Sequence, residues 1–356
     1  MGSWFSSGYY VPTLEDIESY ETYVFDCDGV IWGIKDEDSK TAVAMINHLL
    51  GLGKRAMFVT NNSNKRRAEF VAELERRGVD FKGLSMEEKI GMMISASYTT
   101  AKYLKDQNLH KPFVITSDVG LLEELRMVGI TEYFATIDES GQTAKEFVPA
   151  AMKGAEPSIG QIIRDHPNID SVVVGWDLAL TARKVATAVN YIKWYEDLHR
   201  EHPEDHPDFR EIPIVACSGD AGGVLGAEDF QNKSMKVRAI GNGAMADFIG
   251  RCFDPPREWV DMGKPSDELL RLLTSPEGYG VDRNTALMVG DTLQTDIVFG
   301  NRGGMHTLLV LTGVTTQKEL DHSLQKGDSM RAPTYVLPQL GKFVADGRIG
   351  GVSGNA

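Results

Sequence analysis

The sequence predicts an α/β fold built around a parallel sheet, and two features of its apolar pattern indicate this. Several short apolar runs are β-branched or aromatic and end in Gly, Asp, Asn or Ser, which is typical of buried strands. Helical patterns lie between these runs, and strands that alternate with helices pair in parallel. Ligands of such sheets bind beyond the carboxyl ends of the strands, so functional residues are expected where the apolar runs end.

The apolar runs and the patterns between them place the individual elements. The segment 66–77 is predicted to be a helix that stops at Gly78. Another helix is predicted to follow Ser85, because Ser85 and Glu88 form a capping box, and a third to cover 117–128. The predicted strands are 22–25, 56–59, 113–115, 171–174, 212–216, 285–289 and 307–311.

Length and charge limit the classes of protein that fit. With 356 residues the chain is expected to form two domains, each with its own core. The 51 acidic and 37 basic residues leave a net charge of -14, and no Lys/Arg-rich stripe is present, so no nucleic-acid partner is expected. An anionic substrate would therefore need a metal ion or a specific Lys or Arg in its site.

The cysteine count and the hydropathy pattern predict a cytoplasmic protein without a membrane partner. Cys27, Cys217 and Cys252 are too few for a disulfide framework, and neither a signal peptide nor a membrane-spanning apolar run is found. Residues 1–6 fit the loose N-myristoylation pattern with its glycine at Gly2, and a chance match is the favoured interpretation. The His-rich segment 199–208 is predicted to be a surface loop rather than a metal site.

The strand predicted at 22–25 runs into two acids separated by one residue. Asp26 and Asp28 would face the same way on an extended backbone, and Gly29 permits a tight turn after them. Such a pair of carboxylates suits Mg²⁺, although Asp and Gly are also ordinary turn residues. Cys27 would point to the opposite side, where packing is the favoured role and sensitivity to oxidation the alternative.

Three further strings place polar groups near strand ends. Thr60, Asn61 and Asn62 end the second predicted strand before a helix expected to carry Lys65 and Arg66. Such groups at a helix start can form an anion cradle, although a plain helix cap is the favoured interpretation of this string taken alone.

Lys264 precedes the helix start marked by Pro265, where its ammonium would reach an anion unless it is merely solvated. Asp291 ends another predicted strand and Asp296 follows it, so Asp291 would complete a Mg²⁺ site.

Taken in order, the strings DCDGV, TNNS, GKPS and GDTLQTD resemble the four motifs of haloacid dehalogenase-like phosphatases. The resemblance is closer to the subgroup that contains phosphoglycolate phosphatase, pyridoxal phosphate phosphatase and the 4-nitrophenyl phosphatases, because GLLEELRMVGI, VVVGWD and GGMHTLLVLTGVT are also similar. It implies a Rossmann-like core over 1–108 and 258–356 and a large inserted α/β cap of the C2 type over 109–257. It also suggests a homodimer through the cap.

The resemblance implies a role for each residue of the motifs. Asp26 would be the nucleophile and Asp28 the general acid/base of a Mg²⁺-dependent phosphatase that acts on small phosphorylated metabolites. Thr60, Asn61, Asn62 and Lys264 would bind the phosphoryl group. The Mg²⁺ ligands would be the carboxylates of Asp26 and Asp291 and the backbone carbonyl of Asp28, with Asp296 behind them.

The cap sequence departs from the family pattern at the specificity loop. That loop normally reads close to TNxD, whereas this chain has Cys217-Ser218-Gly219-Asp220, so the acid matches and the amide does not. Insertions around 138–158 and 199–208 lengthen the cap. A phosphoglycolate-like or generic 4-nitrophenyl phosphate phosphatase is expected, with a pyridoxal phosphate phosphatase as the alternative.

Other activities fit the four motifs less well. A dehalogenase would not need the second acid, Asp28, and a phosphomutase is less expected. A non-catalytic scaffold that keeps the fold is the rival from another class, and the intact Asp26, Asp28, Lys264 and Asp291 argue against it.

Overall fold

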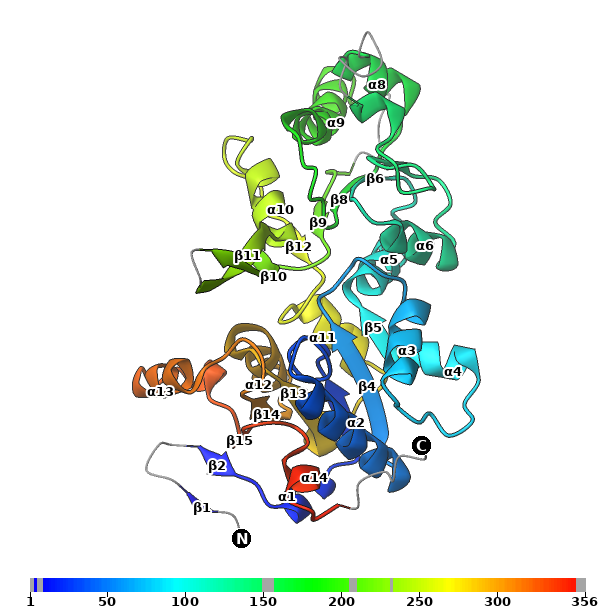
Figure 1. Ribbon diagram of the computed structural model, residues 1–356. Coiled ribbons are helices and arrows are strands. Elements are labelled where there is room, and N and C mark those ends of the chain that lie inside the picture. Colours follow the sequence, from blue (N-terminus) through cyan, green and yellow to red (C-terminus); the bar gives the residue numbers. More distant parts are fainter. Residues whose placement is uncertain (1–2, 5–8, 149–156, 205–209, 231–232, 350–356) are drawn as a thin grey trace. The chain divides into compact units, whose positions relative to one another are not determined.

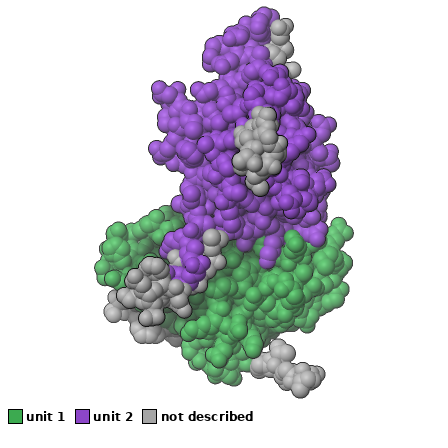
Figure 2. Space-filling model, turned by 45° about the horizontal axis from the view of Figure 1, so that its top comes forward, with its two compact units in different colours: residues 1–60, 67–94, 264–356 green, residues 61–66, 95–263 purple. Residues whose placement is uncertain are grey.

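The computed structural model describes residues 3–4, 9–148, 157–204, 210–230 and 233–349. The chain divides into two compact units (Figure 2), a first unit of 1–60, 67–94 and 264–356 and a second unit of 61–66 and 95–263. The main segment of the second unit begins at residue 95 and ends at residue 263. The sequence instead predicts domain boundaries between residues 108 and 109 and between residues 257 and 258. Gly2 and parts of the segments 138–158 and 199–208 lie outside the described residues.

The first unit contains an eight-stranded sheet in the order β1-β2-β15-β14-β13-β3-β4-β5 (Figure 1). Among the registers described for this sheet, β1 and β2 pair antiparallel, and the neighbouring strands in the order from β2 to β4 pair parallel. The α/β prediction is therefore confirmed. The strands are Ser3–Trp4, Tyr10–Val11, Thr22–Phe25, Arg55–Thr60, Met93–Ser95, Ala286–Gly290, His306–Val310 and Tyr335–Leu337, which are β1, β2, β3, β4, β5, β13, β14 and β15.

Helices cover both faces of this sheet. On one face Tyr23, Phe25 and Phe58 pack with buried residues of α2 and α3, and on the other Leu309 and Val336 pack with Leu320 of α13. Burial on both faces explains why the strands read as continuous apolar runs rather than as alternating patterns. The helices are α1 Leu14–Glu18, α2 Asp36–Gly51, α3 Arg67–Arg76, α4 Met86–Gly91, α11 Asp267–Thr274, α12 Val298–Arg302, α13 Gln317–Gln325 and α14 Lys342–Ala345.

The second unit has its own parallel sheet of five strands in the order β12-β9-β8-β6-β7. It also contains an antiparallel pair, β10 and β11, that the sequence analysis does not predict. The strands are β6 Pro112–Ile115, β7 Phe134–Ala135, β8 Ser171–Val174, β9 Ile214–Ala216, β10 Gly222–Phe230, β11 Lys233–Ile240 and β12 Val260–Asp261. The helices are α5 Ala96–Asp106, α6 Val119–Met127, α8 Ile159–Asp165, α9 Ala182–Glu201 and α10 Asn242–Gly250.

Most predicted elements form close to their expected bounds. The strands over 22–25 and 171–174 have the predicted ends, and the capping box of Ser85 with Glu88 is present. Two details are wrong. Arg66 and Lys65 precede α3, which begins at Arg67, and the first part of the His-rich segment 199–208 is the last turn of α9.

Candidate active site

The chain makes a tight turn immediately after β3, at the middle of the first unit's sheet. The Asp26 N–H donates to the carbonyl of Val289 in β13 at 2.8 Å, which continues the strand pairing into the site. The N–H groups of Ile31 and Trp32 then donate back to the carbonyl of Cys27, at 2.9 and 3.1 Å. This turn buries the side chain of Asp26 and exposes that of Asp28.

Gly29 lets this turn pass close to another strand end. Its φ is +82°, a conformation that L side chains rarely adopt. A Cβ at Gly29 would also overlap the carboxylate of Asp291. Glycine is therefore required twice here, for the backbone conformation and for the approach of Asp291.

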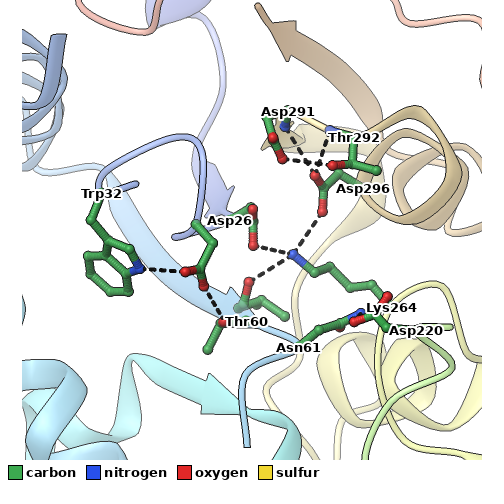
Figure 3. Close-up of polar contacts among 11 residues, drawn as sticks. Asp26, Trp32, Thr60, Asn61, Asp220, Lys264, Asp291, Thr292 and Asp296 are labelled. Atoms are coloured by element: carbon green, nitrogen blue, oxygen red, sulfur yellow. Dashed lines mark hydrogen bonds and ion pairs between the residues drawn. The ribbon is translucent and has the colours of Figure 1, made fainter. Parts of the chain in front are cut away.

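Lys264 joins two of the buried carboxylates. Its Nζ lies 2.5 Å from Oδ1 of Asp26 and 2.8 Å from Oδ1 of Asp296, and it donates to the carbonyl of Val59 at 3.0 Å (Figure 3). The Lys264 side chain is 2% exposed. Burial by itself lowers the pKa of Lys264, but the carboxylates of Asp26 and Asp296 raise it above its ordinary value, so the ammonium stays charged.

Asp291 and Asp296 follow β13 and are anchored by backbone donors. Asp296 lies in the π-helical turn Leu293–Ile297, and its Oδ2 accepts from the N–H groups of Asp291 and Thr292, at 3.0 Å each. Asp291 accepts from the N–H of Val314 at 2.5 Å and from the hydroxyl of Thr292 at 2.9 Å. The geometry of both carboxylates is thus set by the loops that follow β13 and β14.

The three buried acids repel one another. Burial, and then the charge of Asp296, raise the pKa of Asp26 well above its ordinary value, and Lys264 opposes this shift only in part. Burial and Asp296 likewise raise the pKa of Asp291 to about 7. Oxygen atoms of Asp26, Asp291 and Asp296 all lie within 4.8 Å of one another. A set of hard oxygen donors that is short of positive charge is suited to a divalent cation.

Asp28 is held through both of its carboxylate oxygens. Oδ1 accepts from the indole Nε1 of Trp32 at 3.0 Å, and Oδ2 accepts from the hydroxyl of Thr60 at 3.2 Å. From the sequence, Thr60 is expected to bind the phosphoryl group, and Trp32 is not singled out. The one feature of the sequence that could have indicated the contact between Trp32 and Asp28 is their spacing of four residues within one turn.

Asn61, Asn62 and Asp220 belong to the second unit. The Nδ2 of Asn61 donates to Oδ2 of Asp220 at 3.2 Å, and Oδ1 of Asn62 accepts from the N–H of Asn64 at 2.9 Å. The expectation that these amides stand directly at a helix start is wrong, because α3 begins only at Arg67. Their phosphate-binding role stays a prediction.

Cys27 faces the core, as its place between the two acids predicts. Its side chain is buried, and burial together with the charges of Asp26 and Asp28 raises the pKa of the Cys27 thiol well above its ordinary value. A thiol that resists ionisation reacts slowly with oxidants, which favours the packing role.

The described residues contain one cluster of potential metal ligands and no helix that could span a membrane. Asp26, Asp291 and Asp296 form the one group of three or more potential metal ligands found in that part of the chain, so the His-rich segment adds none there. No helix among the same residues is both long and apolar enough to cross a membrane.

Family models match two parts of the chain. Residues 23–131 match the haloacid dehalogenase-like hydrolase model, and residues 261–343 match the HAD-hydrolase-like model. Together the two segments include Asp26, Asp28, Thr60, Lys264 and Asp291.

Characterised relatives resemble the chain over nearly its whole length. Phosphoglycolate phosphatase 2 of Arabidopsis thaliana is 30% identical over 89% of this chain and 90% of its own length. A 4-nitrophenylphosphatase of Schizosaccharomyces pombe is 29% identical over 92% of this chain and 95% of its own length. A solved thermostable NPPase from Geobacillus stearothermophilus has the same fold, with a TM-score of 0.59, 24% identity and coverage of 91% of this chain and 98% of that one.

Proposed function

Since this chain belongs to the haloacid dehalogenase-like hydrolase family and is a phosphatase, we propose that it hydrolyses small phosphomonoesters with Asp26 as nucleophile and Asp28 as general acid/base. The observation that carries this proposal is the convergence of Asp26, Asp28, Lys264 and Asp291 at the carboxyl ends of β3 and β13. Strand ends of a parallel sheet are where ligands of such folds bind.

In the first step the Asp26 carboxylate attacks phosphorus, the bond from phosphorus to the leaving oxygen breaks, and an aspartyl-phosphate forms. Lys264, 2.5 Å from Oδ1 of Asp26, holds the nucleophile in place and offsets the charge that gathers there. Asp28 gives its proton to the leaving oxygen. In the second step water attacks phosphorus and gives a proton to Asp28, the bond from the Asp26 oxygen to phosphorus breaks, and inorganic phosphate leaves, which restores both acids.

Mg²⁺ is the cofactor that we propose for the buried acids, held by the carboxylates of Asp26 and Asp291 and the backbone carbonyl of Asp28. When bound, it supplies positive charge against the repulsion between phosphate and carboxylates. The outer position of Asp296 is supported by its contacts, because two backbone N–H groups occupy Oδ2 and Lys264 pairs with Oδ1. Asp296 thereby keeps Lys264 and the Asp291 backbone in place.

We propose that four residues bind the phosphoryl oxygens: Lys264, Thr60, Asn61 and Asn62. Lys264 and Thr60 are each 2% exposed, so their ammonium and hydroxyl groups are withdrawn from bulk water. The Thr60 hydroxyl is within reach of Asp28 and can turn its hydrogen toward a phosphoryl oxygen, because a hydroxyl both donates and accepts.

We propose a phosphoglycolate-like small acid as substrate, with 4-nitrophenyl phosphate as a generic one and pyridoxal phosphate as the alternative. The names of the two relatives support the first two choices. We further propose that the enzyme works in the reducing cytosol, since all three cysteines are free thiols, and that it forms a homodimer through the cap.

The test of the proposal is Asp26→Asn, which conserves volume and removes the nucleophile. Turnover of 4-nitrophenyl phosphate should be abolished while the far-UV circular dichroism spectrum stays unchanged. Acid quenching of the wild type during turnover, followed by peptide mass spectrometry, should find phosphate on the peptide that contains Asp26. Normal turnover by Asp26→Asn, once deamidation is excluded, contradicts the mechanism, and a wild type inactive on every phosphomonoester favours the scaffold alternative.

A further inference from the structure

The Asp28 carboxyl group has a partner that the proposed reaction does not yet use. We propose that Trp32 is a positioning residue that holds Asp28 through its indole N–H and so orients the acid toward the leaving oxygen. This inference rests on the general acid role proposed for Asp28. It concerns residues of the first unit alone.

The two carboxylate oxygens of Asp28 accept hydrogen bonds from different donors. Trp32 Nε1 lies 3.0 Å from Oδ1, and Thr60 Oγ1 lies 3.2 Å from Oδ2. An indole nitrogen can only donate, so Oδ1 always acts as the acceptor and the acidic proton belongs on Oδ2. The Thr60 hydroxyl can donate to an ionised Oδ2 or accept from a protonated one. Only Oδ2 can therefore exchange a proton without losing its partner.

Backbone hydrogen bonds tie Trp32 to the same turn as the acid. The N–H of Trp32 donates to the carbonyl of Cys27 at 3.1 Å, and the carbonyl of Trp32 accepts from the N–H of Gly29 at 2.7 Å. The residues on either side of Asp28, Cys27 and Gly29, are therefore both bonded to the backbone of Trp32. An exposed carboxylate in a turn would otherwise sample several rotamers, and the side-chain bond from Trp32 selects one of them.

The indole ring has two further contacts within the first unit. It stacks on Phe70 with ring centroids 6.3 Å apart and an interplanar angle of 8°, and the Arg77 guanidinium carbon lies 5.8 Å from the ring centroid. Arg77 is itself held by Glu73 Oε1 at 2.7 Å and by the hydroxyl of Ser39 at 3.2 Å. A half-buried ring packed in this way presents its N–H in one direction, which a positioning role requires.

The leaving group provides a readout that a purely structural role would not change. An alkoxide leaves poorly and needs the proton from Asp28, whereas 4-nitrophenolate leaves without one. The quantity to compare is kcat/KM, because it contains no step after the leaving group has departed. The hydrolysis of the aspartyl-phosphate, in which Asp28 acts as base, therefore does not enter the comparison.

The experiment compares Trp32→Phe with the wild type on glycerol phosphate and 4-nitrophenyl phosphate. We expect kcat/KM to fall about tenfold on the alkyl ester, a part of the roughly 10²–10⁴-fold that a general acid supplies, and less than about twofold on the aryl ester. Should Trp32→Phe fail to fold, 3-benzothienylalanine at position 32 keeps the bicyclic ring and replaces N–H by sulfur. Trp194→Phe, the same change at an exposed tryptophan of α9, should alter neither value.

Equal losses on both esters, or no loss on either, overturn the positioning role. Asp28→Asn on the same pair separates this failure from that of the proposed function. If Asp28→Asn lowers the ratio of alkyl to aryl kcat/KM and Trp32→Phe does not, only the inference about Trp32 is wrong. If Asp28→Asn leaves the ratio unchanged, the acid role of Asp28 is wrong as well.

Discussion

Asp291 is placed where its own charge is disfavoured. Burial and the neighbouring Asp296 raise its pKa to about 7, whereas an unfolded chain gives an aspartate a pKa of about 3.9. The folded protein therefore binds this proton more tightly than the unfolded chain does. The stability gained from that proton is complete below about pH 4 and is lost as the pH rises through 7.

The metal-free protein should consequently be less stable at pH 8 than at pH 5, and Asp291→Asn should reverse part of that loss. The neutral amide removes the repulsion by Asp296, so at pH 8 the variant should unfold with about 1–3 kcal/mol more free energy than the wild type. At pH 5 the difference should shrink. Urea unfolding in EDTA measures both values, and a wild type that gains stability between pH 5 and 8 contradicts the expectation.

Asp220 poses a question of selectivity at the same scale. It follows β9 in the second unit and accepts a hydrogen bond from Asn61, the residue next to Thr60 in the chain. The carboxylate can recognise a donor on the leaving group or repel a second carboxylate, while a turn-stabilising role is the plain alternative.

Asp220→Ala should therefore change kcat/KM unequally across phosphorylated metabolites and spare 4-nitrophenyl phosphate, because the chemistry at Asp26 is untouched. A panel that includes phosphoglycolate, glycerol phosphate and pyridoxal phosphate measures this. Asp220→Asn serves as the matched control, since it keeps the volume of the side chain and removes its charge. An equal loss of kcat/KM on every substrate, or no loss on any, would show that residues other than Asp220 select the substrate.

At the level of the elements, the loop after β14 holds Gly29 and Asp291 in place by hydrogen bonds. The Thr312 hydroxyl donates to the carbonyl of Gly29 at 2.6 Å. The N–H of Val314 donates to the carboxylate Oδ2 of Asp291 at 2.5 Å, and the N–H of Thr315 donates to the backbone carbonyl of Asp291 at 3.1 Å. The loop can make these contacts because Gly313 has no side chain, and a Cβ there would overlap the Asp291 carboxylate.

Gly313→Ala should lower the free energy of unfolding by about 1–3 kcal/mol, because the added methyl group forces a packed loop apart. It should also weaken activation by Mg²⁺, since Asp291 has to move. Gly91→Ala is the control, because a Cβ at the end of α4 meets nothing within 4 Å. Denaturation midpoints and Mg²⁺ titrations provide the measurements, and equal behaviour of the two variants would show that the loop adapts.

For the whole molecule, the net charge of -14 makes the binding of a cation decisive for an anionic substrate. We expect activity to vanish in EDTA and to return with Mg²⁺, and both Mg²⁺ and Ca²⁺ to raise the Tm by binding the folded state. Ca²⁺ should not restore activity, because its ligands lie at about 2.3–2.6 Å rather than the about 2.0–2.1 Å of Mg²⁺. Undiminished turnover in a metal-free preparation contradicts this prediction.

The sequence by itself determined the α/β class, the family and the strands β3, β4, β6, β8, β9, β13 and β14, because buried strands are short β-branched or aromatic runs and the motifs are local strings. The sequence did not predict the shorter strands β1, β2, β5, β7, β12 and β15, each of two or three residues. It did not predict the antiparallel pair β10 and β11, whose strands contain glycines and charged residues and so lack the apolar run that marks a buried strand.

Only the tertiary structure decided which side chains of the motifs meet. Lys264 contacts Asp26 from 238 positions along the chain, and no local pattern contains a contact between two strand ends. Trp32 reaches Asp28 only because the turn after β3 folds back on itself, and Asn61 pairs with Asp220 rather than with a helix start. Local pattern sets secondary structure, whereas the crossovers of a parallel sheet bring distant residues to one edge.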